Sequence, residues 1–469
     1  MRANGSKRSL RRMNQKESKQ VIEKARVSDW ERKIISLREQ GKLKNKWLDY
    51  RINHLLPEIM NRENLDMWII IAREYNEDPV IMSFLPSPMI TARRRTVLVF
   101  SKKEDGTIER LCLSRPGTGL DRIYKGVWTN PKGSNWHQFK KILPGDISPE
   151  QKETDPSETQ WECLARIIRE RDPQAIGINI SEGTAFADGL THTEYENFMK
   201  HIDPVYKDRI KSAERLVMGW LEKRTKDEIA AYTGIMQIAR GIIAEAFSSR
   251  VVHPGVTTNT DVVWWMRQRV NDLGLEAWFP YEVSIFREGC ESIGEDEVIM
   301  PGDILHCDFG LCYLGLATDT QENAYVLKLG ETEAPAGIQA AHTLGNKLQD
   351  ILAAEYVEGR SGNEILAKAL AKAKNEGIKP CIYTHPIGYH GHGAGPAIGM
   401  YDMQGGLPDI RGQYELHNDT CYSMELNITT NIPEWNDQEI VLGLETDIVF
   451  TDNKVYFLGG RETKLHLIK

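Results

Sequence analysis

The alternation of apolar and polar residues divides the chain into two parts with different expected structures. Between Leu65 and His201, apolar runs of strand length alternate with stretches of helical periodicity. The expected strands are 67–72, 96–101, 110–114 and 175–180, and the expected helices are 160–171 and 194–201. Because strands and helices are interleaved, this part predicts an α/β domain.

A second domain is expected after a break near residues 212–225. Thr225 and Glu228 form a capping box, in which a hydroxyl and a carboxylate satisfy exposed N–H groups at a helix start. The apolar residues that follow recur at three-and-four spacing and predict one packing face, formed by Ile229, Tyr232, Ile235, Met236, Ala239, Ile242, Ile243, Ala246 and Phe247. The helix should end before Pro254.

The second part repeats one order of elements, in which helices precede strand-like sequence. In its first half we expect a helix at 260–274 and strands at 283–286, 304–308 and 325–327. The second half should hold a helix at 337–356, a capping box at Ser361 and Glu364, a helix that ends at Gly377, and further strands. This order suggests an internal duplication whose halves pack their sheets together and leave a site between them.

The composition excludes several classes of function. A chain of 469 residues exceeds the roughly 250–300 residues of one core, and 41% hydrophobic with 27% charged residues is typical of folded domains. The formal net charge of −8 argues against a nucleic-acid partner, because phosphate backbones are bound by dense lysine and arginine surfaces. No apolar run reaches the ~18–20 residues of a spanning helix, so no membrane partner is expected.

The start of the chain is expected to form a solvated basic arm over residues 1–24. Its first twenty residues carry seven lysines and arginines against one acid, Glu17, and no apolar run follows them. A transit peptide, or a chain whose secretion signal has been removed, stays open. Seven cysteines, an odd number without CxxC pairs, predict reduced thiols and a cytoplasmic protein.

Four carboxylates lie among apolar residues of strand-like sequence in the second part. They are Asp308, Asp319, Glu425 and Glu445. A single one could be an exposed edge-strand acid, but four buried acids stay ionised only beside cations, so a bound cation explains them together. A turn near 313–315 would let Asp308 and Asp319 face each other from two strands. Oxygen-rich sites with one imidazole suit manganese, magnesium, iron, cobalt or zinc.

A glycine-rich segment at 384–399 carries three histidines, His385, His390 and His392. Glycines let the backbone approach a ligand closely. An imidazole can bind a metal or donate a hydrogen bond to developing charge, although any one of the three could be an ordinary loop histidine. From the residues alone their roles stay open.

Together these residues resemble the pita-bread metallopeptidases, which include methionine aminopeptidase, aminopeptidase P, prolidase and the related creatinase. The resemblance covers roughly residues 222–469. In that family the metal ligands follow in the order Asp, Asp, His, Glu, Glu, and this chain supplies Asp308, Asp319, His385, Glu425 and Glu445. The family also has a glycine three residues and a catalytic histidine seven residues after the ligand histidine. Gly388 and His392 match these positions, which favours His385 over His390 as the ligand.

The resemblance implies a fold and its boundaries. Residues 25–215 resemble the α/β N-terminal domain of the aminopeptidase P, prolidase and creatinase branch, and residues 216–469 resemble the α+β pita-bread catalytic domain. The chain departs from the family between Trp278 and Ile304, where no histidine matches the family's substrate-side imidazole.

The resemblance also implies a reaction. A family member would bind two divalent cations, with manganese as the first expectation and cobalt, zinc, iron or magnesium as alternatives. It would hydrolyse short peptides, at Xaa-Pro bonds, with a water that bridges the metals, and it would form a homodimer. Glu425 would accept the proton of that water, His392 would donate a hydrogen bond to the substrate or oxyanion, and His390 with His392 would contact the substrate.

Two other functions stay open from the sequence. One is a creatinase-type hydrolase of non-peptide C–N bonds, and the other is a catalytically inactive pita-bread domain that serves as a binding module. Neither needs bound metal, so a complete set of five ligand positions favours the peptidase.

Overall fold

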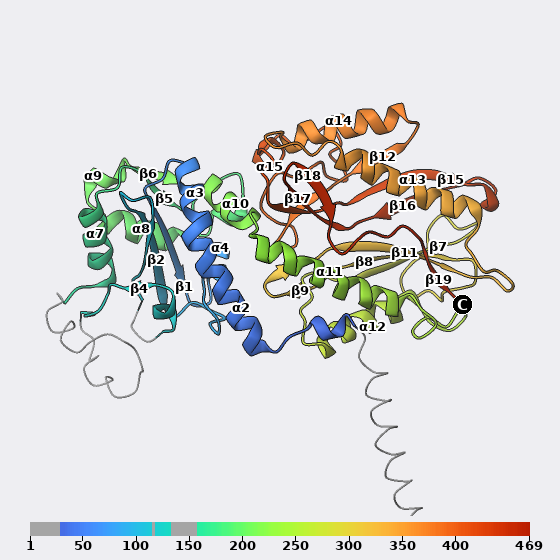
Figure 1. The fold of residues 1–469 in the computed structure, drawn as a ribbon, viewed down its shortest axis with the longest axis horizontal. Helices are drawn as coiled ribbons and strands as arrows, with labels where there is room; N and C mark the ends of the chain where they lie inside the picture. The colour runs from blue at the N-terminus through green and yellow to red at the C-terminus, as the bar shows by residue number, and fades with distance from the viewer. Residues whose placement is uncertain (1–28, 115–117, 133–156) are drawn as a thin grey trace, which may run out of the picture.

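The computed structural model describes residues 29–114, 118–132 and 157–469. Figure 1 shows an N-terminal domain on the left and a C-terminal domain on the right. The chain passes between them from helix α10 (Glu214–Glu222) to helix α11 (Lys226–Ala246). The basic arm expected over residues 1–24 lies outside the described residues, and the expected division at residue 215 stays a prediction.

The N-terminal domain is built on one six-stranded sheet with the order β4-β3-β2-β1-β5-β6. Strand β1 pairs antiparallel with β2 and parallel with β5. The strands are β1 (Met67–Arg73), β2 (Arg95–Lys102), β3 (Ile108–Cys112), β4 (Lys125–Gly126), β5 (Ile176–Ile178) and β6 (Ile210–Ser212). The strands predicted from the apolar runs are therefore present, with ends shifted by a few residues.

Helices cover both faces of this sheet, because successive side chains of a strand point to opposite sides. Met67, Ile69 and Ile71 of β1 pack with helices α7 (Gln160–Arg171) and α8 (His192–His201). Trp68 and Ile70 pack on the other side with α2 (Leu37–Tyr50), α3 (Leu56–Arg62) and α10. Shorter elements of this domain are η2 (Arg51–Leu55), α4 (Pro79–Met82), η3 (Leu120–Arg122), η4 (Ala185–Ala187) and α9 (Pro204–Lys207), whereas η1 (Glu31–Lys33) lies against α11 of the other domain. The expected α/β domain is confirmed.

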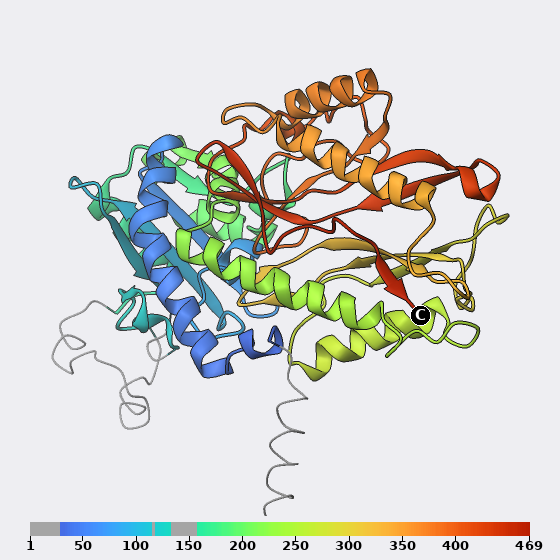
Figure 2. The ribbon, with the colours of Figure 1, turned by 45° about the vertical axis from the view of Figure 1, so that its right-hand side comes forward.

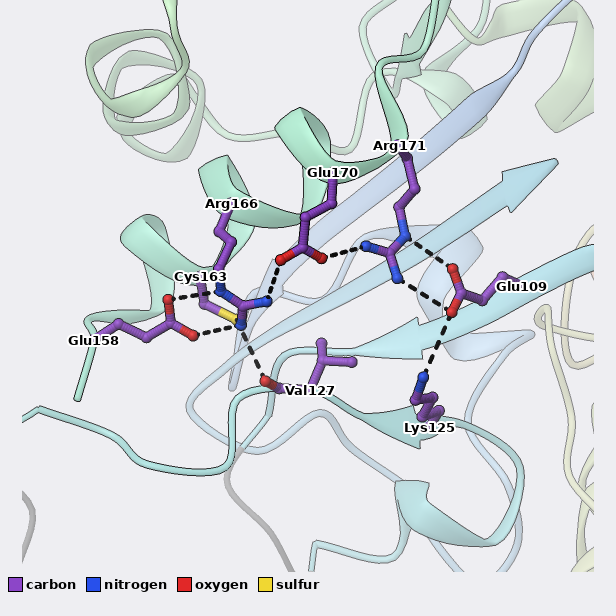
Figure 3. Close-up of polar contacts among 8 residues, drawn as sticks. All are labelled: Glu109, Lys125, Val127, Glu158, Cys163, Arg166, Glu170 and Arg171. Atoms are coloured by element: carbon purple, nitrogen blue, oxygen red, sulfur yellow. Dashed lines mark hydrogen bonds and ion pairs between the residues drawn. The ribbon is translucent and has the colours of Figure 1, made fainter. Parts of the chain in front are cut away.

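A ladder of charged side chains fastens α7 to the edge of the sheet, as Figure 3 shows. Arg171 donates two N–H groups to Glu109 of β3, over 2.8 and 3.2 Å. Glu170 accepts hydrogen bonds from both Arg166 and Arg171, over 2.9 and 2.8 Å. Arg166 continues the ladder to Glu158. These partly exposed pairs orient α7 rather than add much stability.

The larger sheets of the C-terminal domain form two groups. The first group is the sheet with the order β19-β11-β8-β7. The second group consists of two sheets, with the orders β12-β15-β16 and β13-β14-β17-β18. The strands are β7 (Glu282–Phe286), β8 (Ile304–Phe309), β9 (Cys312–Tyr313), β10 (Leu316–Ala317), β11 (Thr320–Val326), β12 (Lys379–Ile382), β13 (His385–Ile387), β14 (Thr420–Ser423), β15 (Leu426–Ile432), β16 (Gln438–Leu444), β17 (Asp447–Thr451), β18 (Lys454–Phe457) and β19 (His466–Ile468). A backbone bridge between Gln321 and Glu445 joins the two groups.

Two pairs of helices enclose these strands. Helices α11 and α12 (Asn259–Asp272) lie below the strands in Figures 1 and 2, and α13 (Ala336–Ala353) and α14 (Gly362–Asn375) lie above them. The capping boxes predicted at Thr225 and Ser361 are both present. Remaining short elements are α15 (Ile410–Gln413) and η5 (Pro433–Trp435). Each pair of helices packs together with neighbouring strands in its own apolar core. The two groups of strands therefore meet between the helix pairs.

Strand β11 begins earlier than the sequence predicts. The expected strand covered 325–327, whereas β11 starts at Thr320. Its first four residues are polar but buried, and three of them, Gln321, Glu322 and Asn323, hydrogen-bond to partners inside the domain. The expected turn between Asp308 and Asp319 is confirmed, with Leu314 and Gly315 at φ 57° and 78° between β9 and β10.

All seven cysteines are free thiols. None of the described helices combines the length and the apolar composition that a membrane span requires.

Candidate metal centre

Five side chains from distant parts of the sequence meet between the two groups of strands. Asp308 lies near the end of β8, and Asp319 lies directly before β11. His385 begins β13, Glu425 follows β14, and Glu445 follows β16. We refer to these five residues as the carboxylate cluster.

The histidine lies at the centre of the carboxylate cluster. His385 Nε2 is 3.7 Å from Asp319 Oδ2, 3.9 Å from Glu425 Oε2 and 3.8 Å from Glu445 Oε1. Two overlapping groups, Asp319 with His385 and Glu445, and Asp308 with Glu425 and Glu445, each keep their ligand atoms within 4.8 Å of one another. Since Glu445 belongs to both groups, the cluster can hold two adjacent cations that share a ligand.

Several atoms of the cluster are buried without a hydrogen-bond partner. They are Asp308 Oδ1, Asp319 Oδ1, His385 Nε2 and Glu445 Oε2. Leaving such atoms unpaired in the interior costs free energy, whereas a cation would satisfy all four. Their oxygen-rich chemistry with one imidazole fits a divalent metal ion.

Without a cation, the pKa values of the four carboxyl groups are raised. Burial and the nearby charge of Asp308 raise the pKa of Glu425 to about 8. Burial also raises the pKa of Asp308 to about 6, and the pKa values of Asp319 and Glu445 rise well above their usual range. Bound cations would reverse this effect, because an opposite charge nearby favours the ionised form.

His385 is prepared to act as a neutral ligand. Its Nδ1 lies 3.0 Å from the carbonyl oxygen of Pro386, a contact that places the ring hydrogen on Nδ1 and leaves Nε2 free. Burial and, to a lesser extent, the neighbouring His392 together lower the pKa of His385 to about 4. The imidazole therefore carries no proton on Nε2 at neutral pH.

Three residues outside the predicted site support the cluster. Gln321 donates a hydrogen bond to Glu425 Oε1 over 2.6 Å, and Ser423 donates one to Glu445 Oε1 over 2.5 Å. Asp447 is buried behind them, and its Oδ2 accepts the backbone N–H of Asp319 at 3.4 Å. Gln321 and Asp447 each lie two residues after a cluster acid, and this spacing along a strand was the available signal.

The other two histidines occupy different places. His392 is exposed beside the cluster, and its ring centre is 4.7 Å from that of His385. The ring of His390 instead packs on Phe186 of the N-terminal domain at 4.8 Å. It lines a cavity of about 220 Å³ at the domain junction, which includes Trp47 and Met82. The structure therefore brings His392, and not His390, beside the carboxylate cluster.

A second group of acids in the same domain differs from the carboxylate cluster because its acids already have partners. Glu322, Glu462 and His466 also lie close together. Glu322 accepts a hydrogen bond from Arg240 over 2.6 Å and is 2.6 Å from His466 Nε2. Glu462 is 2.8 Å from Nε2 of His342. These acids already have cationic or hydrogen-bonding partners, so this group fits a structural role.

Comparison with known proteins agrees with the geometry. Residues 233–452 match the sequence profile described as metallopeptidase family M24, a range that contains all five cluster residues and His392. No curated protein matches the chain in sequence.

Solved structures with the same fold span both domains. X-Pro aminopeptidase of Thermotoga maritima has a TM-score of 0.57 at 13% identity and covers 87% of this chain and 99% of its own. Xaa-Pro dipeptidase of Bacillus anthracis has 0.52 at 15% identity, with 91% and 99% covered. Prolidase of Pyrococcus furiosus has 0.51 at 15% identity, with 87% and 99% covered. At these identities the likeness shows the fold, an α/β N-terminal domain followed by a pita-bread domain.

Proposed function

We propose that this chain, whose residues 233–452 match metallopeptidase family M24, is a peptidase that uses two divalent cations to hydrolyse short peptides at Xaa-Pro bonds. The observation that carries the proposal is the convergence of four carboxylates and one imidazole, with four of their polar atoms buried and unpartnered. An inactive binding module would have no use for such a costly arrangement.

Asp308, Asp319, His385, Glu425 and Glu445 would hold the cations. When bound, two cations would lower the pKa of a water molecule and polarise the scissile carbonyl group. Glu425 is suited to accept the proton of the attacking water. Its side chain keeps 16% of its surface exposed, against 1% for Glu445, so a water molecule can reach it.

His392 is suited to stabilise the charge that develops on the substrate. It is exposed beside His385 and can donate a hydrogen bond to the oxygen of the scissile carbonyl as this oxygen becomes negative. Loss of one such donor typically costs about 10²–10³-fold in rate.

The preference for Xaa-Pro bonds is the finer part of the proposal. It is supported by the two-domain fold, which the chain shares with structures named as X-Pro aminopeptidase, Xaa-Pro dipeptidase and prolidase. Manganese as the metal, a homodimer and a cytoplasmic location stay predictions from the sequence.

The test replaces the proposed proton acceptor. Glu425→Gln keeps the size of the side chain but removes its basic oxygen, so we expect turnover to fall by about 10²–10⁴-fold while the protein stays folded. The assay uses an Xaa-Pro dipeptide and a longer peptide with proline in second position, after chelation and re-addition of Mn²⁺, Co²⁺ or Zn²⁺.

The matched control is Glu439→Gln, which changes an exposed glutamate of β16 that pairs with Lys379. It should leave turnover unchanged. Activity of the Glu425→Gln variant at the wild-type level would refute the role of Glu425. Absence of bound metal in purified, fully active protein would refute the two-cation proposal as a whole.

A further inference from the structure

The segment before β7 places an indole beside the carboxylate cluster. Trp278 donates its Nε1–H to the backbone oxygen of Thr318 over 2.9 Å. Thr318 directly precedes Asp319, so the indole is tied to the strand end that carries a candidate ligand. The segment is anchored further by the backbone N–H of Cys312, which bonds to the oxygen of Glu276 over 2.7 Å.

Two glycines make room for this indole. A Cβ atom at Gly391 would overlap the six-membered ring of Trp278, and one at Gly310 would overlap its Nε1. The ring therefore lies directly against the backbone of the histidine segment, one residue before His392. Any side chain at position 391 would displace the indole. The indole can therefore occupy this place only because position 391 is glycine.

The indole continues the row of rings that starts at the cluster. His392 stands edge-on to His385 with ring centres 4.7 Å apart, and Trp278 stands edge-on to His392 at 5.3 Å. Phe279 lies beyond, with its ring centre 4.4 Å from that of Trp278. An apolar surface thus begins directly beside the histidine that is proposed to contact the scissile carbonyl.

The surface that Trp278 leaves accessible is apolar. The side chain is only half-buried, and its one polar group is already satisfied by Thr318. The ring packs against the apolar core that α11 and α12 share with the strands, and this contact fixes its position. A rigid indole with an open carbon surface binds apolar groups at little cost in conformational entropy.

We propose that Trp278 is a specificity-determining residue, whose indole forms the apolar wall against which the substrate residue beside the scissile bond packs. This inference rests on the proposed peptidase function. It assigns a recognition role to the segment in which the chain has no substrate-side histidine.

The experiment measures kcat/KM of wild type, Trp278→Ala and Trp278→Phe for the dipeptides Leu-Pro, Gly-Pro, Leu-Ala and Gly-Ala. Removing an apolar wall should lower the preference for the larger apolar residue by about ten-fold, within the range known for hydrophobic pockets. A fall in the Leu/Gly ratio supports the wall and assigns it to the residue before the bond. A fall in the Pro/Ala ratio supports the wall and assigns it to the residue after the bond. Trp278→Phe should retain most of the preference.

A second variant keeps the test independent of the folding of Trp278→Ala. Gly391→Ala adds a methyl group where the indole lies, so it should reduce the same ratio in a protein that retains its tryptophan. The control is Trp264→Ala, which removes an exposed indole from α12 and should change no ratio. Binding of the same dipeptides to the metal-loaded Glu425→Gln protein, with and without the added Trp278→Ala substitution, is measured by calorimetry, and only the double variant should show the loss of preference.

An equal loss for all four dipeptides would overturn the inference, because a merely structural tryptophan changes all substrates alike. Failure of the proposed function gives a different result. In that case the metal-loaded wild-type protein cleaves none of the four dipeptides, and the inference fails with it.

Discussion

Gln321 donates a side-chain hydrogen bond to Glu425 over 2.6 Å and thereby links the two groups of strands at the carboxylate cluster. Gln321 also lies opposite Asp308 in the β8–β11 register. Its amide thus fixes one oxygen of Glu425 and leaves the other for a cation. We expect Gln321→Ala to weaken Mn²⁺ affinity by about 10–100-fold, as loss of a supporting hydrogen bond does at other metal sites. Competition with a chromogenic chelator measures the change.

The control for this prediction is Gln339→Ala, which changes an exposed glutamine of α13 whose side chain bonds to the backbone oxygen of Ala334. It should bind Mn²⁺ as the wild type does. Equal affinities of the Gln321→Ala and wild-type proteins would mean that Glu425 is held without this hydrogen bond.

Local sequence patterns predicted most of the elements of the fold. The capping boxes at Thr225 and Ser361 depend on residues three positions apart, so they can be read without knowledge of the rest of the chain. A further box at Thr258 is closed by Asp261, an aspartate in place of the glutamate of the usual pattern, and the helix begins at Asn259 and not at the predicted residue 260.

The supporting residues of the site could not be predicted in the same way. Gln321 reaches Glu425 and Trp278 reaches Thr318, across 104 and 40 positions of the chain. Such contacts depend on the register between strands, which the pattern of single strands does not contain. The set of five cluster residues came from the order of ligands in a resembling family, and their spacing alone left several assignments open.

The carboxylate cluster makes the stability of the metal-free protein depend on pH. The pKa of Glu425 is raised to about 8 and that of Asp308 to about 6, so the folded protein binds more protons than the unfolded chain below these values. The free energy of unfolding of the metal-free protein therefore decreases as pH rises from about 4.5 toward 8. Bound cations replace these protons.

We therefore expect the difference in Tm between Mn²⁺-loaded and chelated protein to grow by several degrees between pH 6 and pH 8.5. Comparing the two forms cancels the titration of groups elsewhere. Differential scanning calorimetry at constant ionic strength measures the difference. In the Glu425→Gln variant the growth should be smaller, since one titrating group is replaced by a neutral one. A difference that stays constant with pH would contradict the raised pKa values.

A fully buried charge cluster joins the N-terminal domain to the histidine segment. Arg51 of η2 donates a hydrogen bond to Glu228 Oε2 over 3.0 Å, and both side chains are inaccessible to solvent. Arg224 lies 3.7 Å from the other oxygen of Glu228. The hydroxyl of Tyr389 donates to that same oxygen over 3.3 Å, and the guanidinium of Arg224 lies 4.4 Å from the Tyr389 ring centre.

We expect Arg51→Met to lower the free energy of unfolding by about 3–5 kcal/mol, because it leaves Glu228 buried with less compensating charge. Arg51→Lys should cost less, since it keeps the charge and loses only the second arm of the guanidinium, which binds the backbone oxygen of Trp220. The control is Arg169→Ala, which removes the ion pair of Arg169 with Asp203 on the surface. It should lower the free energy of unfolding by less than about 1 kcal/mol. Urea unfolding followed by tryptophan fluorescence measures all three. If Arg51→Met and Arg169→Ala cost the same, the buried pair contributes no more to stability than a surface pair.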